Sequence, residues 1–289
     1  MVAFNGTLHR YAPKHVAFEF EPLAYKKVVV MIGGMTDGLL TVPFVDRMGP
    51  ILNEVDYGLI QIQLTSSFKG YGTTSLDNDI NEIEMLIKYL KSEAGGNRDK
   101  IILMGHSTGS QDVIHYILKK GSYGIDAAVL QGSCSDREAF ADEVGIEELN
   151  KLNELPLKLV SEGKGDELLP SVYANQMGGT PVTAYRWSSL MTKGGDDDYF
   201  SSDLGEEAWK STLGQITIPF LVAYPENDEF VPSFIDKGKL LKTWEKCSNP
   251  LYWSKCSGLI KGGMHWLPET NSQDYFYDML TKFINEFSL

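Results

Sequence analysis

Short apolar runs rich in β-branched residues alternate with helical patterns along this chain of 289 residues. The run 27–32 is apolar and ends in two glycines, which is typical of a strand buried on both faces. Similar runs predict further strands at 58–64, 100–104, 127–132, 218–224 and 258–262. Because crossover helices join the strands of a parallel sheet, this alternation predicts an α/β fold with a mainly parallel central sheet flanked by helices.

Helical patterns lie between these runs. One helix is expected to start near Thr74 or Ser75 and to stop at Gly95-Gly96, and others are expected at 111–120 and 271–287. The first of these has an apolar stripe at helical spacing, made by Leu76, Ile80, Ile83, Ile87 and Leu90.

The alternation of strands and helices disappears between Gly132 and Ile218. Residues 137–163 have helical patterns, and the segment up to Gln215 also contains loops rich in Gly and Asp. We therefore expect a single domain over residues 1–289 with an inserted cap at residues 135–215; the alternative is a set of long surface connections. The aromatic and Met side chains of the cap are assigned to its own core, with the lining of an acyl or alcohol pocket as the alternative: Tyr173, Met177, Tyr185, Trp187 and Met191.

The pattern G-x-S-x-G occurs at residues 105–109, where an apolar strand run enters it and an amphipathic helix leaves it. In that setting a nucleophilic serine is held in a strained turn between strand and helix. The two glycines allow close packing of backbone, and the following helix N-terminus directs free amides toward developing negative charge. This context predicts that Ser107 is a nucleophile; the alternative is a simple Gly-rich turn.

A serine nucleophile needs a base, and the base needs a carboxylate that orients it. His265 is the candidate base because it alone among the five histidines follows a late strand, after turn glycines. The other four histidines are given structural roles: His9 and His15 before the core begins, His106 within the motif and His115 on the following helix. Asp228, four residues past the strand at 218–224, is the expected carboxylate, with Glu226 and Glu229 as rivals that spacing does not exclude.

Acyl transfer also needs donors for an oxyanion. One is expected to be the backbone N–H of Thr108, directly after the nucleophile. The other is expected from the loop 33–38, with Met35 preferred and Gly34 as the alternative. The competing interpretation of this loop is an ordinary Gly-rich turn at a strand end.

Charge and motifs exclude several other classes of function. A formal net charge of −13 argues against a nucleic-acid partner, and no apolar run reaches the ~20 residues that span a bilayer. No nucleotide-binding or zinc-binding spacing is complete, so we expect no cofactor and no metal. Three cysteines without framework spacing and the absence of a secretory signal predict free thiols and a cytoplasmic location.

These motifs resemble the α/β-hydrolase superfamily over essentially the whole chain. A closer likeness rests on the segments 33–38, 66–76 and 105–109, which are similar to a fungal and plant family that includes intracellular siderophore esterases. Those esterases cut ester bonds of fusarinine-type iron carriers. The resemblance implies Ser107, Asp228 and His265 as a catalytic triad, in agreement with the choice made from the residues.

The sequence is compatible with two alternative functions from different classes. The first is a cofactor-independent serine esterase that acts on a small-molecule ester through an acyl-enzyme. The sequence leaves open the substrate class, the preference for ester over thioester or amide, and the oligomeric state. The second is a ligand-binding or scaffolding protein that has the same fold and an idle triad.

Overall fold

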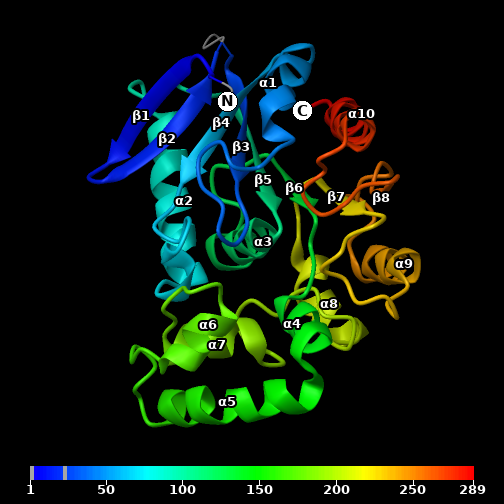
Figure 1. The fold of residues 1–289 in the computed structure, drawn as a ribbon. Coiled ribbons are helices and arrows are strands. Elements are labelled where there is room, and N and C mark those ends of the chain that lie inside the picture. The colour runs from blue at the N-terminus through cyan, green and yellow to red at the C-terminus, as the bar shows by residue number, and fades with distance from the viewer. Residues whose placement is uncertain (1–2, 22–24) are drawn as a thin grey trace.

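The computed structural model describes residues 3–21 and 25–289, and these form one sheet of eight strands flanked by helices (Figure 1). The strand order is β1-β2-β4-β3-β5-β6-β7-β8, in which β1–β2 and β2–β4 pair antiparallel and all the other pairs are parallel. The strands are β1 Gly6–Ala12, β2 His15–Phe20, β3 Lys27–Ile32, β4 Tyr57–Gln63, β5 Lys100–His106, β6 Ala127–Gln131, β7 Phe220–Pro225 and β8 Gly258–Ile260. The predicted α/β class with a mainly parallel sheet is therefore confirmed.

The N-terminal hairpin of β1 and β2 was not foreseen. His9 lies on β1 and His15 on β2, so the expectation that both precede the core is wrong; Ala17 on β2 packs in that core. The sequence signal is weak because β1 is a largely exposed edge strand and β2 buries the charged Glu19. Arg98 neutralises this carboxylate at 2.7 Å, which permits its burial.

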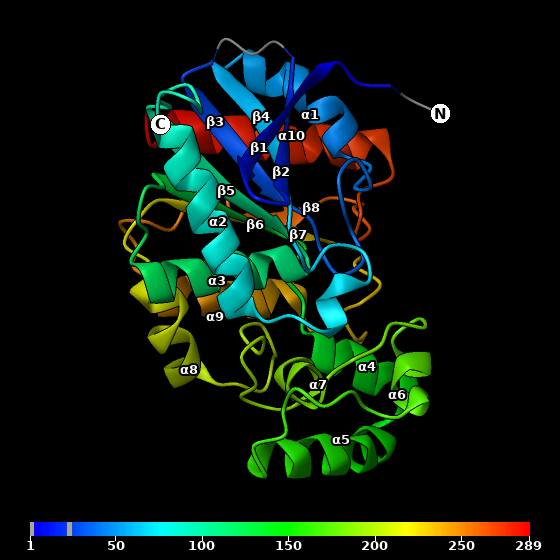
Figure 2. The same ribbon diagram turned by 90° about the vertical axis from the view of Figure 1, so that its left-hand side faces the viewer.

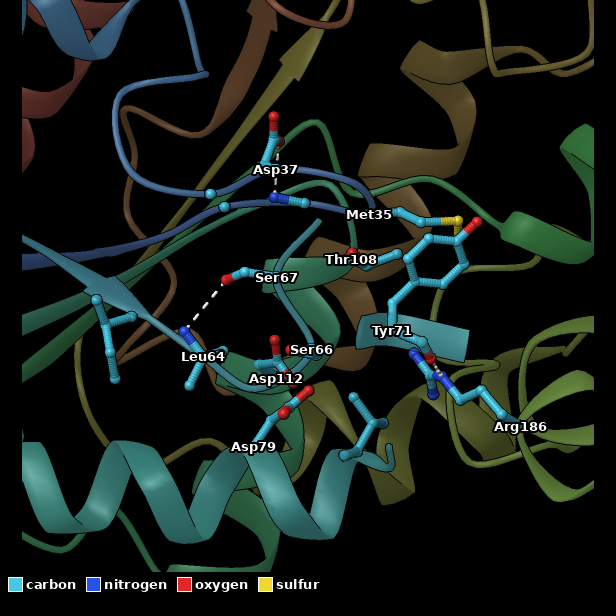
Figure 3. A pocket seen from close by; sticks show the side chains of 15 residues that line it. Met35, Asp37, Leu64, Ser66, Ser67, Tyr71, Asp79, Thr108, Asp112 and Arg186 are labelled. Atoms are coloured by element: carbon cyan, nitrogen blue, oxygen red, sulfur yellow. Dashed lines mark hydrogen bonds between the residues drawn. The ribbon is translucent and has the colours of Figure 1, made fainter. Parts of the chain in front are cut away.

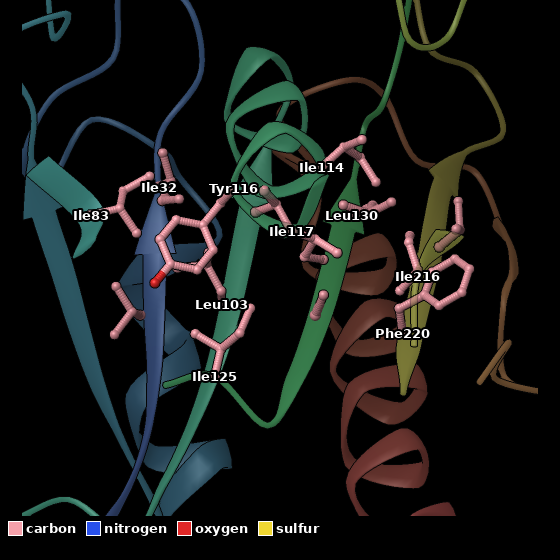
Figure 4. Packing of buried hydrophobic residues seen from close by; sticks show 14 of the residues in the cluster. Ile32, Ile83, Leu103, Ile114, Tyr116, Ile117, Ile125, Leu130, Ile216 and Phe220 are labelled. Atoms are coloured by element: carbon pink, nitrogen blue, oxygen red, sulfur yellow. The ribbon is translucent and has the colours of Figure 1, made fainter. Parts of the chain in front are cut away.

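Two layers of helices cover the two faces of the sheet (Figure 2). Residues of the central strands alternate between them: Val28 packs toward one layer and Val29 toward the other. Ile32 and Leu103 of the sheet and Ile114 of α3 belong to the apolar cluster on the first face, where Ile114 lies beside Leu130 (Figure 4). The first face is covered by α2 Leu76–Lys91, α3 Thr108–Lys120 and α9 Lys237–Cys247, and the second by α1 Val45–Asn53 and α10 Thr270–Glu286.

The ends of α2 and α3 show how well local signals place a boundary. The Ser75 hydroxyl accepts from the Asn78 amide and caps α2, as expected for a helix starting there. The helix ends at Lys91, before the Gly95-Gly96 stop that the sequence predicted, because the chain turns at Ser92. Gly121, in the left-handed region at φ 62°, ends α3.

Five helices and a 3-10 turn lie between β6 and β7, and α4 to α7 group together on one side of the sheet (Figures 1 and 2). Helices α4 to α7 share an apolar cluster that includes Leu149 and Trp187. Trp209 of the next helix and Leu213 pack instead in the core of the sheet. The division of the chain into a domain and a cap at residues 135–215 stays a prediction. The elements are α4 Asp136–Val144, α5 Ile146–Ser161, α6 Ser171–Gln176, α7 Ala184–Met191, α8 Glu206–Ser211 and η2 Leu213–Gln215; a similar 3-10 turn, η1 Gly70–Gly72, precedes α2.

Over the residues described, none of the helices combines the length and the apolar character that crossing a membrane requires.

Candidate active site

Ser107 connects β5 to α3 with a strained backbone, at φ 53° and ψ −125°. Such a conformation is uncommon for a residue with a Cβ, and it matches the turn in which α/β-hydrolases hold a nucleophile. A Cβ on Gly105 would lie 2.1 Å from the Gly109 carbonyl oxygen, and one on Gly109 would lie 2.7 Å from that of Gly33. The flanking glycines are therefore needed for close backbone approach, as their place in the motif suggested.

Asp228 and His265 are brought together from the ends of neighbouring strands. The Nδ1 atom of His265 lies 2.8 Å from Oδ2 of Asp228, and both residues are 2% exposed. Because a carboxylate accepts hydrogen bonds, this contact places a proton on Nδ1 and leaves Nε2 as the basic atom.

The rival carboxylates contact backbone instead. Glu226 Oε2 accepts from the Gly262 amide at 2.8 Å, and Glu229 Oε2 accepts from the His265 amide at 2.9 Å. Among the described residues, only Asp228 bonds the imidazole ring of His265. The two glutamates thus hold the loop that carries the histidine, while the aspartate orients its side chain.

Ser107 and His265 open into one cavity of about 350 Å³. The cavity lies between the sheet and the segment that follows β6, and one face of α4 forms part of its wall. Met177 and Met191 line it and also pack, as the sequence suggested, with Tyr173 and Trp187 in the apolar cluster of the segment after β6. The other lining residues are Met35, Thr36, Asp37, Tyr71, His106, Cys134, Asp136, Ala139, Phe140, Glu143, Gln176, Gly178, Phe230 and Trp266.

The loop after β3 packs directly on the nucleophile. A Cβ on Gly34 would lie 2.6 Å from the Cβ of Ser107, so the backbone of this loop approaches the serine as closely as its atoms allow. The Gly34 amide donates to Asp37 Oδ2 at 2.9 Å, and Asp37 Oδ1 accepts from the Thr41 hydroxyl. In the part of the chain that is described, the amide of Met35 donates no hydrogen bond.

His106 lies beside His265, with ring centroids 4.9 Å apart. It is fully buried, and its Nδ1 contacts the side-chain oxygen of Gln131. Burial, and next the charge of His265, lowers the pKa of His106 to about 3. His106 therefore stays neutral at neutral pH, which agrees with a structural role; His115 is likewise held between Asp77 and Tyr199.

Cys134 lines the same cavity but is poorly suited to attack. The thiol is buried, and burial raises its pKa well above the ordinary value, with the charges of Asp228 and Asp136 acting in the same direction. Because the thiolate is the nucleophilic form, this cysteine is unreactive at neutral pH.

A second cavity, of about 20 Å³, is lined in part by the same loop after β3 (Figure 3). Asp79 of α2 and Asp112 of α3 line it, and each has a buried carboxylate oxygen without a partner in the described residues. Arg186 of α7 reaches the same cavity, donates to the Tyr71 carbonyl oxygen at 2.9 Å and pairs with Asp197. Sequence reasoning missed this cluster because its members come from distant segments.

No group of three or more His, Cys, Asp or Glu residues is placed to hold a metal ion within residues 3–21 and 25–289.

Residues 1–287 match the family described as "Protein of unknown function (DUF1749)". The chain belongs to the DUF1749 family. A relative from Schizosaccharomyces pombe, the UPF0613 protein PB24D3.06c, is 33% identical over 283 residues, which cover 90% of this chain and 89% of that protein. The fusarinine C esterase sidJ of Aspergillus fumigatus is 30% identical over 316 residues, which cover 91% of this chain and 89% of the esterase.

A solved structure extends this likeness. The siderophore hydrolase EstB from Aspergillus fumigatus superimposes with a TM-score of 0.82 and 26% identity, over 98% of each chain. Together with the named esterase relative, it confirms the α/β-hydrolase fold and the membership of a family that includes siderophore esterases. This DUF1749 protein is an esterase-type hydrolase.

Proposed function

We propose that this DUF1749 protein is a serine carboxylesterase in which Ser107 is the nucleophile, His265 the general base and Asp228 the residue that orients the base. The observation that carries the proposal is the buried Asp228–His265 pair, which opens into the same cavity as a serine in a strained strand–helix turn. A nucleophile, an oriented base and a cavity for the substrate are the parts that acyl transfer requires.

The oxyanion donors in this proposal are the backbone amides of Met35 and Thr108. Thr108 follows the nucleophile at the start of α3, where the first amides of a helix have no partner within it. Gly34, the alternative donor, already donates to Asp37, which favours Met35. The close approach of Gly34 to Ser107 supports a position for the Met35 amide near the developing oxyanion.

The reaction then takes two steps. His265 Nε2 accepts the hydroxyl proton of Ser107 as Oγ attacks the ester carbonyl, and Asp228 stabilises the imidazolium that forms. The imidazolium gives its proton to the leaving alcohol, and water, activated by the same histidine, releases the acid from the acyl-enzyme. No hydrogen bond joins Ser107 to His265 in the described residues, so the first transfer needs the serine hydroxyl to approach Nε2 when substrate binds.

For the substrate, the relatives favour a siderophore-type ester, because two of them are named for fusarinine C and siderophore hydrolysis. The cavity of about 350 Å³ has room for a substantial part of such a molecule. The three cysteines are free thiols, which supports the proposed cytoplasmic location.

Labelling with a fluorophosphonate tests this function. The wild-type protein should form one covalent adduct on Ser107, detected by mass spectrometry of the intact chain and its peptides, and Ser107→Ala should form none. Ser133→Ala is the matched control, because Ser133 is buried with a hydroxyl that has no partner in the described part of the chain. It should label and hydrolyse p-nitrophenyl butyrate like the wild type.

A folded wild-type protein that neither labels nor turns over short esters would overturn the proposal. That result would instead favour a ligand-binding protein with an idle triad, which the same experiment therefore distinguishes.

A further inference from the structure

One face of α4 presents two carboxylates to the reaction cavity. Asp136, Ala139, Phe140 and Glu143 all line it, at the spacing i, i+3, i+4 and i+7 that makes one stripe of a helix. Asp136 stands at the start of the stripe, directly after the N-cap Ser135. A wall of this kind gives the substrate a negatively charged surface beside the reacting groups.

No lysine or arginine among the described residues lines this cavity, although the charges of Arg186 and His265 act on Asp136 and lower its pKa. The third carboxylate of the wall, Asp37, is satisfied by the Gly34 amide and the Thr41 hydroxyl. Asp136 has one neutral partner, the Gln111 amide, which donates to Oδ2 at 2.7 Å. It forms no ion pair with a lysine or arginine in the part of the chain that the structure describes.

A buried carboxylate without an ion pair is costly. Burial, and next the charge of Asp197, raises the pKa of Asp136 to about 7. The first turn of α4 favours a carboxylate, because the N-terminal end of a helix carries a partial positive charge. This preference does not explain why Asp136 is buried, because an exposed carboxylate would interact with the helix end in the same way. A cation in the cavity would remove the cost and hold Asp136 in its ionised form.

Aromatic side chains line the cavity together with these carboxylates. Phe140, Phe230 and Trp266 are all part of the lining, and the rings of Phe230 and Trp266 meet edge to face with centroids 5.1 Å apart. Aromatic faces attract ammonium groups, and a neighbouring carboxylate adds a charged hydrogen-bond acceptor. Carboxylates and aromatic rings without a resident cation form the surroundings that an ammonium ion prefers.

We propose that Asp136 is a specificity-determining residue that binds a positively charged ammonium group of the substrate, so that the enzyme prefers esters that carry such a group close to the scissile bond. The proposal rests on the proposed function, hydrolysis at Ser107. The bond to be cut lies at Ser107 and the ammonium at Asp136, on the wall of the same cavity.

Pairs of esters that differ only in charge test the proposal. Butyrylcholine and 3,3-dimethylbutyl butyrate have the same shape, with a charged nitrogen in one and a neutral carbon in the other, on the alcohol side. Ethyl 6-aminohexanoate and ethyl heptanoate make the comparison on the acyl side. At about pH 8, where Asp136 is ionised, the wild type should show a kcat/KM about tenfold to a hundredfold higher for the charged member of at least one pair.

Asp136→Asn removes the charge and keeps an oxygen that accepts from Gln111. It should reduce the charged-to-neutral ratio to about one, while kcat/KM for the neutral esters changes less than about threefold. Asp142→Asn is the matched control, because Asp142 is an exposed carboxylate on the same helix that does not line the cavity. This control loses the same charge and should keep the wild-type ratio.

Two outcomes would overturn the proposal. One is a ratio near one in the wild type for both pairs, and the other is an equal fall of kcat/KM for charged and neutral esters in Asp136→Asn. The second outcome would mean that Asp136 acts through the imidazolium of His265 and not on the substrate.

Binding separates a failure of this proposal from a failure of the proposed function. If the wild type cleaves no ester, calorimetry with Ser107→Ala still compares butyrylcholine with 3,3-dimethylbutyl butyrate. Tighter binding of the charged ester, lost in Ser107→Ala combined with Asp136→Asn, would support the ammonium site even without catalysis. Equal binding of both esters would reject it.

Discussion

The two cavities that the loop after β3 lines share part of their walls and differ in the charged side chains that surround them. Met35, Asp37 and Tyr71 line both. The smaller, of about 20 Å³, has room for roughly one water molecule and brings Asp79 and Asp112 together with Arg186, a cation from the chain. The larger, of about 350 Å³, places Asp136 and Glu143 on its wall with no lysine or arginine among the residues described.

This difference in charge indicates that the smaller cavity contributes to stability and the larger one to the reaction. Arg186 comes from α7, whereas Asp79 and Asp112 come from helices that cover the sheet, so the smaller cavity joins the segment after β6 to the sheet around one buried arginine, which is held by the Tyr71 carbonyl oxygen and Asp197. The larger cavity leaves its charge for a substrate to balance. We therefore expect substitutions in the larger cavity to change catalysis or specificity, and substitutions in the smaller one to change stability.

The largest expected effect is a loss of kcat on substitution of Asp228, beside the larger cavity. Asp228→Asn should lower kcat by about 10⁴-fold with little change in KM, because the amide no longer fixes the tautomer of His265 or stabilises its cation. Steady-state hydrolysis of p-nitrophenyl butyrate measures it. Glu226→Gln and Glu229→Gln are the controls: each keeps an oxygen that accepts from the backbone amide, and each should stay within about tenfold of the wild type. A similar loss in either glutamine variant would contradict the assignment of Asp228.

The second prediction concerns the smaller cavity, where a substitution should lower stability and not activity. Arg186→Leu leaves Asp197 without its cation and should lower the free energy of unfolding by about 3–5 kcal/mol, as breaking a buried ion pair does. Urea unfolding measures this loss, and kcat of the protein that remains folded should fall less than about tenfold. Arg47→Leu breaks the exposed pair with Asp274 and should cost about 1 kcal/mol or less. Equal costs for the two arginines would mean that the smaller cavity does not hold the segments together.

The same contrast explains what the sequence could predict. Ser107, Asp228 and His265 follow strand ends in chain order, and strand ends meet at one edge of a parallel sheet, so local patterns were enough to nominate them. The central parallel strands were predictable because burial on both faces makes them largely apolar runs, whereas β8, at the edge of the sheet, is short and only partly buried. Local patterns did not reveal the β1–β2 hairpin, in which Glu19 is buried against the distant Arg98.

The missed residues depend on tertiary contacts. Arg186, Asp79 and Asp112 lie on three helices, and nothing in their local spacing indicates that they meet. Asp136 had a usable signal: the 136, 139, 140 and 143 stripe follows a strand end directly, where a substrate wall is expected. Deciding that this stripe faces the reaction cavity, and not the core of the cap, required the packing of α4.

The third prediction acts on the wall between the cavities. Gly34→Ala places a Cβ 2.6 Å from that of Ser107, so the loop or the serine must move. Such a displacement should lower kcat/KM by about 10²-fold, because nucleophile and oxyanion donor lose their alignment. Gly258→Ala is the control, since a Cβ there meets nothing within 4 Å and the backbone is not in the left-handed region. An active Gly34→Ala enzyme would show that this loop does not supply the oxyanion donor.

The smallest expected effect is a change in how stability depends on pH. Burial raises the pKa of Asp79 to about 7, although Arg186 acts in the opposite direction. The folded protein therefore keeps a proton on Asp79 between about pH 4 and pH 7, where the unfolded chain has lost it, so folding stability falls as the pH rises through this range. Asp79→Asn removes that slope. Relative to the wild type, its stability should be about 2.5 kcal/mol higher at pH 8 than at pH 5.

Thermal unfolding of both proteins from about pH 5 to pH 8 measures this difference, and activity at pH 8 should change little because Asp79 does not line the larger cavity. Asp142→Asn, on the exposed side of α4, should leave the slope unchanged. If Asp79→Asn lost stability equally at every pH, the carboxylate would be ionised throughout and paired with Arg186. The smaller cavity would then hold an ordinary buried ion pair, and the difference between the cavities would rest on Arg186 alone.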